Sequence, residues 1–180
     1  RAAREAGRQA DRSTDADGDH RVQLFGSGAI LRQSLAAGQL LAEKFGISSD
    51  IWSVTSYTQL RRDAQECRRW NMLHNTAQPR RSFIETQLAD AEGPTIAASD
   101  YLRCLAEQVA PWCPGGLFAL GTDGMGRSET RPALRRHFEV DAENVTFAAL
   151  HSLANEVQFD QAELPKALNS LDIDPEKVNP

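Results

Sequence analysis

Residues 121–128 are the part of the sequence whose residue types most readily allow chemistry, because three glycines precede an expected helix start. Glycine-rich loops that lead into helices bind anions, since their backbone N–H groups point at the ligand. The segment lacks the Gly-Lys-Ser pattern of a P-loop, and Arg127 is its only cation. Two interpretations stay open, a structural or interdomain role and an anion site, and the sequence favours the first.

A second glycine pair, Gly26 and Gly28, follows an apolar run and has the spacing that opens a dinucleotide-binding fingerprint. The third small residue of that fingerprint would fall on Leu31, and no acidic residue ends the next apolar run to bind a ribose. The simpler interpretation is that these glycines allow a sharp turn between a strand and a helix.

The sequence predicts no metal site and no complete catalytic group. Asp15, Asp17 and Asp19 are spaced like the start of a calcium loop, but His20 replaces its glycine and Gly26 its final glutamate. The histidines form no HExxH motif, and a GxSxG elbow is absent from the sequence. We therefore assign no catalytic, cofactor-binding or metal-binding residue.

One expected helix carries four arginines, and His74 follows its end. Asp63 and Glu66 are interleaved with these arginines at helical spacing, which indicates a solvated, ion-paired face. His74 lies in an expected loop, where a surface histidine is favoured over a functional one. The arginines are Arg61, Arg62, Arg68 and Arg69.

Composition narrows the function classes further. The 180 residues carry a net charge of −5, which argues against a nucleic-acid partner. No apolar run approaches the roughly 20 residues that a membrane-spanning helix needs, so we expect a soluble protein without a membrane partner. Its three cysteines, Cys67, Cys104 and Cys113, are an odd number without CxxC spacing, which predicts free thiols in a cytoplasmic protein. Because the first residue is Arg1, we expect the chain to be part of a longer polypeptide.

Short apolar runs alternate with amphipathic stretches from Val22 onward, which predicts an α/β fold, a three-layer α/β/α sandwich around a mostly parallel sheet. Residues 1–21 contain no large apolar side chain, so we expect a flexible linker or extension there, and a single domain over residues 22–180. We expect a helix from Tyr101 to Val109. The predicted strands are residues 22–25, 51–54, 95–98 and 117–120.

Four segments of the sequence together resemble one family. In order and in spacing they are similar to the C-terminal, transketolase-like domain of the homodimeric bacterial pyruvate dehydrogenases, the thiamine-dependent decarboxylating enzymes of the pyruvate dehydrogenase complex. The resemblance runs from about Val22 to Pro180, and it does not include residues 1–21. The segments are residues 22–28, 50–56, 69–74 and 121–128.

The resemblance implies an enzyme that decarboxylates pyruvate with thiamine diphosphate and reductively acetylates lipoamide. It implies that thiamine diphosphate and magnesium bind to other domains of the subunit, because Gly121-Thr122-Asp123-Gly124 lacks the trailing helix and asparagine of the magnesium motif. The implied partners are the remaining domains, a homodimer mate and the lipoyl-bearing dihydrolipoyl acetyltransferase. Another transketolase-like enzyme and a stand-alone anion-binding regulatory module remain the alternatives.

Two expectations follow from this interpretation. The isolated domain should neither bind thiamine diphosphate nor decarboxylate pyruvate, because these residues assemble no cofactor motif. Valine in place of Gly124 or Gly126 should impair the complete subunit, because glycine permits backbone angles that a Cβ disfavours.

Overall fold

A computed structural model describes residues 7–9, 14–16 and 20–180. Its centre is a five-stranded sheet in the order β1-β3-β2-β4-β5. The strands β2, β3, β4 and β5 run parallel, and β1 joins β3 as an antiparallel edge. The α/β fold with a mostly parallel sheet is therefore confirmed. The strands are β1 (Gly7–Gln9), β2 (Arg21–Gly26), β3 (Ser48–Val54), β4 (Thr95–Ala98) and β5 (Leu117–Leu120).

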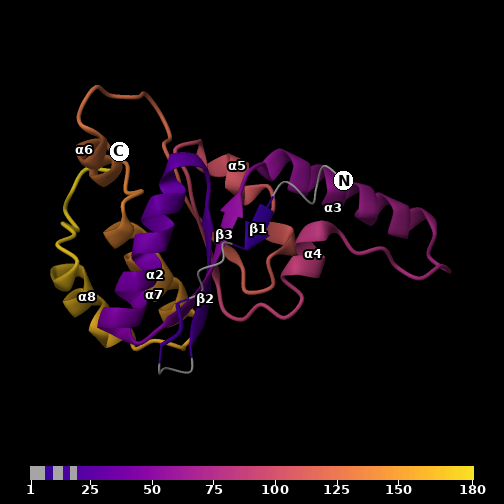
Figure 1. Cartoon of the computed structure of the whole chain (residues 1–180), viewed down its shortest axis with the longest axis horizontal. Helices are drawn as coiled ribbons and strands as arrows, with labels where there is room; N and C mark the ends of the chain where they lie inside the picture. Colours follow the sequence, from indigo (N-terminus) through magenta and orange to yellow (C-terminus); the bar gives the residue numbers. More distant parts are fainter. Residues whose placement is uncertain (1–6, 10–13, 17–19) are drawn as a thin grey trace.

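Helices cover both faces of the sheet, as Figure 1 shows. One face packs against α2 (Leu31–Phe45), α7 (Ala142–Asn155) and α8 (Leu164–Ser170), with α6 (Arg131–His137) at one end. The other face packs against α3 (Tyr57–Leu73), α4 (Phe83–Gln87) and α5 (Arg103–Glu107). The described residues also form three 3-10 turns, Gly28–Ile30, Ala110–Trp112 and Gln161–Glu163. The three expected layers are present.

Successive strand residues supply the two cores. Leu24 of β2 is fully buried among the residues on the α2 side, while its neighbour Phe25 is buried on the α3 side with Trp52 and Ala97. This alternation follows from the period of two in a strand. Both faces are covered, so the parallel strands are apolar on both sides.

Local signals set the helix boundaries. Gly46 ends α2 in the left-handed conformation with φ of 66°. Ser56 caps α3 by accepting a hydrogen bond from the backbone N–H of Gln59. The helix predicted from Tyr101 to Val109 is shorter, Arg103–Glu107. It begins later because Leu102 has a ψ of 138°, outside the helical range, and the Tyr101 carbonyl accepts a hydrogen bond from Thr122.

The segment predicted as a linker contacts the sheet in its described parts. Gly7–Gln9 pair with β3, and Thr14 exchanges backbone hydrogen bonds with Ser49. The Thr14 hydroxyl lies 2.7 Å from the Ser49 hydroxyl. Composition did not indicate this pairing, because it uses backbone and small polar groups instead of apolar anchors. Residues 1–6, 10–13 and 17–19, which include Asp17 and Asp19 of the calcium-like pattern, lie outside the described residues.

No helix among the described residues is long and apolar enough to cross a membrane.

Candidate functional site at the carboxyl edge of the sheet

The topology creates a crevice between the ends of β2 and β4. The chain leaves β2 into α2 on one face of the sheet, and it leaves β4 into α5 on the other face. The loops after these neighbouring strands therefore diverge, and open α/β sheets bind ligands at such a switch point. The candidate site lies at this edge.

The Gly26–Gly28 turn leads into the first wall of the crevice, which Ala29 and Ile30 form. A Cβ on Gly26 would lie 2.7 Å from the Leu31 Cα, so only glycine fits this close approach. Gly28 has a left-handed φ of 57°. Ser27 donates a 2.7 Å hydrogen bond from its hydroxyl to the Val54 carbonyl. The glycines serve the sharp turn, as the simpler interpretation of the sequence holds.

The loop of residues 121–128 forms the opposite wall, and its first half is tied to the start of α5. Thr122 donates a 2.8 Å backbone hydrogen bond to the Tyr101 carbonyl. The Asp123 carboxylate accepts a hydrogen bond from the Arg103 backbone N–H at 3.1 Å and pairs with its guanidinium at 2.8 Å. The second half, from Gly124 onward, is exposed.

A cavity of about 470 Å³ lies between these walls and α6. Its apolar lining consists mainly of Ile30, Leu134, Phe138 and Val140. All of these except Leu134 are also buried residues of the core. Asp100, Thr122 and Gly126 add polar and backbone groups. Three arginines complete the lining, Arg127, Arg131 and Arg135.

The cavity carries positive charge. Among the described residues, no carboxylate forms an ion pair with Arg127, Arg131 or Arg135. The pKa of the nearby His137 is lowered, first by desolvation and second by the positive charges of Arg127 and Lys177. The negative charge of Glu139 acts in the opposite direction and raises it. The surroundings of α6 therefore disfavour a further cation.

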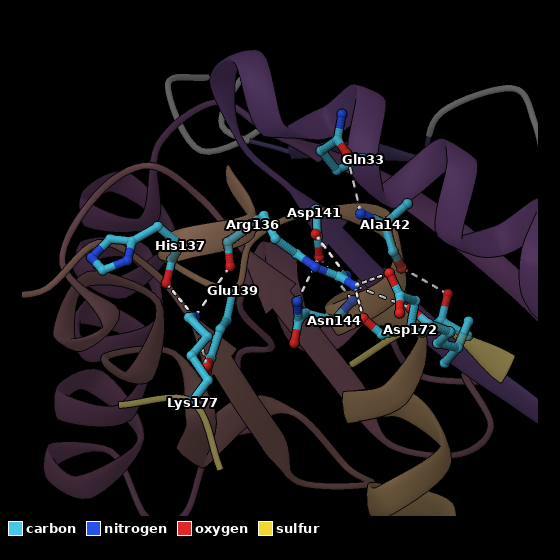
Figure 2. A network of polar contacts seen from close by, with 11 residues as sticks. Gln33, Arg136, His137, Glu139, Asp141, Ala142, Asn144, Asp172 and Lys177 are labelled. Atoms are coloured by element: carbon cyan, nitrogen blue, oxygen red, sulfur yellow. Dashed lines mark hydrogen bonds and ion pairs between the residues drawn. The ribbon is translucent and has the colours of Figure 1, made fainter. Parts of the chain in front are cut away.

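A polar network behind the cavity fixes α6 (Figure 2). Arg136 pairs with the Asp141 carboxylate at 3.1 Å and donates to the backbone carbonyls of Leu171 and Asp172. Asp141 also accepts a hydrogen bond from the Asn144 backbone N–H at 3.0 Å, which caps α7. The arginines of α6 thus sit on a helix that is anchored to α7 and to the C-terminal segment.

Two further contacts join this network to other elements (Figure 2). The Lys177 ammonium donates to the His137 carbonyl at 2.5 Å and pairs with Glu139 at 3.0 Å. The Gln33 side chain, on α2, accepts a hydrogen bond from the Ala142 backbone N–H at 3.1 Å. The loop between α6 and α7 is therefore held from both sides.

The other residues that the sequence analysis considered, His74 and the arginines of α3, do not line this cavity. His74 stacks on Trp70 with ring centroids 4.4 Å apart, and Arg80 lies over the same indole at 4.0 Å. The arginines of α3 are exposed as expected, but within the described residues no carboxylate forms an ion pair with them. Asp63 instead accepts a 2.6 Å hydrogen bond from the Phe83 backbone N–H, so the prediction of an ion-paired face was wrong.

Sequence reasoning found Arg127 but missed Arg131, Arg135 and Asp100. The signal was present, because the three arginines recur every four residues. Like charges at i and i+4 destabilise a helix, and Arg131 and Arg135 form such a pair on α6 with no acid between them. No group of three or more His, Cys, Asp or Glu residues in the described part of the chain has a metal-binding arrangement.

The comparisons of this sequence with known families and known proteins agree with one another. Residues 11–141 match the sequence profile described as "Transketolase-like TK C-terminal domain". The chain is 46% identical over 160 residues to the pyruvate dehydrogenase E1 component of Cupriavidus necator, and 47% identical over 161 residues to that of Escherichia coli K12. Each alignment covers 89% of this chain but only 18% of the relative.

Solved structures give the same fold. A split-gene transketolase in an inactive tetramer matches with a TM-score of 0.53 and 18% identity, over 79% of this chain and 42% of that one. The transketolase of Leishmania mexicana matches with a TM-score of 0.52 and 15% identity, over 84% of this chain and 18% of that one.

Proposed function

Because the chain belongs to the transketolase-like TK C-terminal domain family, we propose that it is this domain of a pyruvate dehydrogenase E1 component. The observation that carries the proposal is identity of 46–47% to such components over 89% of the chain. The chain spans 18% of the length of these relatives, so the complete subunit would supply the remaining parts.

In this proposal the complete, cytoplasmic subunit decarboxylates pyruvate with thiamine diphosphate and magnesium and reductively acetylates lipoamide. The described residues of this chain do not fit a magnesium–diphosphate site. Asp123, the acid between glycines, is already engaged by the Arg103 backbone and guanidinium. We therefore assign no catalytic or cofactor-binding role to any residue of this domain.

The role of the domain in this proposal is assembly with the remaining domains and with a homodimer mate. Large apolar side chains are exposed at the carboxyl edge, where Tyr101 and Leu102 are about half exposed and Met125 is 89% exposed. Apolar groups gathered at one edge favour protein contacts. Presentation of the lipoyl domain of the dihydrolipoyl acetyltransferase is the finer part of the same proposal.

The test begins with the complete reading frame that contains this chain. Purified complete subunit is expected to decarboxylate pyruvate when thiamine diphosphate and magnesium are supplied, and to reductively acetylate the lipoyl domain of the acetyltransferase. Removal of residues 22–180 should abolish this activity. Transfer of ketol groups between sugar phosphates, without turnover of pyruvate, would favour the transketolase alternative.

A matched pair of surface variants tests the assembly role. Met125→Glu should weaken the dimer of the complete subunit, because it places a charge on an apolar contact. Val157→Glu is the control, since this side chain is 91% exposed beyond the far end of α7. Equal sedimentation behaviour of both variants and the wild type would contradict a contact at the carboxyl edge.

A further inference from the structure

The arginine-lined cavity has a local charge opposite to that of the chain. The chain carries a net charge of −5, but three arginines and one acid, Asp100, line the cavity and leave a local charge of +2. Unpaired guanidinium groups that share a concave surface repel one another, and an anion relieves that repulsion.

The positions of these arginines on the chain increase the repulsion. Arg131 and Arg135 are one turn apart on α6, and Arg127 precedes them by four residues. Arg136, the next residue along α6, is turned to the other side, where it is satisfied by Asp141 and by two backbone carbonyls. Arg136 therefore lies on the side of α6 away from the cavity, whereas Arg131 and Arg135 line the cavity.

The apolar part of the cavity is preformed. Ile30 and Val140 are each 2% exposed and Phe138 is 7% exposed, so their positions are fixed by the core. A volume of about 470 Å³ lies in the range of small-molecule sites, about 300–1,000 Å³. The cavity thus combines a rigid apolar floor with a cationic rim.

We propose that this cavity binds a small organic phosphate, with the phosphate group on Arg127, Arg131 and Arg135 and the organic part against the apolar lining that Leu134 and Phe138 share with the buried Ile30 and Val140. This inference does not rest on the proposed function, because it concerns binding by the described residues themselves.

Charge selects a phosphate monoester over a carboxylate. A phosphate monoester carries a charge between −1.5 and −2 at neutral pH, which matches the local charge of +2. One carboxylate would leave a positive charge uncompensated. Guanidinium groups also bind phosphate oxygens in pairs of parallel hydrogen bonds, which favours arginine in such sites.

Phenyl phosphate is a suitable probe, because it joins a dianionic phosphate to a flat apolar ring. Isothermal titration of the 180-residue chain should give saturable binding, with a Kd of about 0.1–1 mM for a ligand of this size. Inorganic phosphate, which lacks the ring, should bind at least about tenfold more weakly. Benzoate, with a single charge, should also bind more weakly, and added salt should weaken all three.

Variants assign the binding to these residues. Arg127→Gln and Arg131→Gln should each weaken phenyl phosphate binding at least about fivefold, because each removes charge-assisted hydrogen bonds. Arg62→Gln, an exposed arginine of α3 on the opposite face, is the matched control and should bind as the wild type does. Asp100→Asn should tighten binding, because it removes the acid of the cavity, and this gain cannot arise from misfolding.

Three results would overturn the proposal. The first is the absence of saturable binding up to about 10 mM, well above the expected Kd. The second is unchanged binding by both arginine variants. The third is a pair of results: phenyl phosphate binds to the 180-residue chain but not to the complete subunit, and Arg131→Gln weakens the association of this domain with the rest of the subunit. Together they would show that an acidic protein segment fills the cavity.

Discussion

Lys177 illustrates how much one side chain depends on its partners. Its ammonium reaches the backbone carbonyls of Arg136 and His137 and the carboxylate of Glu139 (Figure 2). Glu139 has a left-handed φ of 58°, which is strained for a residue with a Cβ. Lys177 therefore holds a strained loop in place and ties the C-terminal segment to α6.

Lys177→Met should destabilise the protein by about 1–3 kcal/mol, because it leaves two carbonyls and a carboxylate without their cation. The matched control is Lys166→Met. Among the described residues Lys166 pairs only with Glu163, and the two side chains are 75% and 46% exposed, so its removal should matter little. Urea unfolding of the two variants measures the difference. Equal midpoints would show that the Lys177 contacts do not contribute to stability.

The three cysteines are free thiols with different surroundings. Cys104 is exposed, Cys67 is partly buried and Cys113 is buried. Burial raises the pKa of the Cys113 thiol to about 12, against a smaller opposing effect of a hydrogen bond with Thr95. Burial, and then the charges of nearby acids, also raises the pKa of Cys67. The thiolate is the reactive form, so these cysteines should differ in reactivity.

Alkylation with iodoacetamide at about pH 8 should modify Cys104 first, then Cys67, and Cys113 only after unfolding. Mass spectrometry of peptides taken over time would give this order. Denatured protein without reductant should show all three thiols, as the sequence predicts. Rapid modification of Cys113 in the folded protein would show that the α5 region opens.

At the scale of elements, the sequence predicted the parallel strands well because each is apolar on both faces and ends in a turn signal. The sequence also predicted the end of α2 at Gly46 and the cap of α3 at Ser56. The antiparallel strand β1 was not, since its pairing with β3 uses backbone groups that composition does not reveal.

The sequence predicted only part of the candidate site, because local sequence patterns again do not reveal how distant segments meet. Glycines marked the loop of residues 121–128, but the cavity needs Asp100 from the loop after β4 and two arginines from α6. These residues come together only through the strand order, which local sequence signals do not specify. Like-charge spacing on α6 was the one local clue.

The loop glycines have different roles, which gives a sharper prediction than the sequence alone. A Cβ on Gly121 would lie 2.5 Å from the Tyr101 carbonyl oxygen, and Gly124 has a left-handed φ of 81°. Gly126 has open space around it and no left-handed φ. Backbone angle therefore supports the expected effect of valine at Gly124, but gives no reason for one at Gly126.

Gly121→Ala should destabilise the protein by about 1–3 kcal/mol, because the methyl group would force the two loops apart and break the Thr122–Tyr101 hydrogen bond. Gly126→Ala is the control and should change stability by less than about 0.5 kcal/mol. Thermal unfolding of both variants gives the comparison. A tolerated Gly121→Ala would show that the loop after β4 moves freely at this point.

At the scale of the whole molecule, one sheet separates two apolar cores. Leu41 of α2 is fully buried on one side, and Leu60 of α3 is 3% exposed on the other. Trp52 and Trp112 both belong to the α3 side, and Trp70 lies on α3 itself. Tryptophan fluorescence therefore reports on one core, while helical ellipticity reports on both.

Because every parallel strand contributes to both cores, we expect the two sides to unfold in a single transition. Leu41→Ala removes a buried side chain from the tryptophan-free core, and substitutions of this kind destabilise by about 2–5 kcal/mol. Its fluorescence midpoint in urea should fall as far as its ellipticity midpoint. Leu60→Ala, the matched variant on the tryptophan side, should show the same coincidence. A fluorescence midpoint that stays at the wild-type value in Leu41→Ala, while ellipticity falls, would show that the sheet does not couple its two faces.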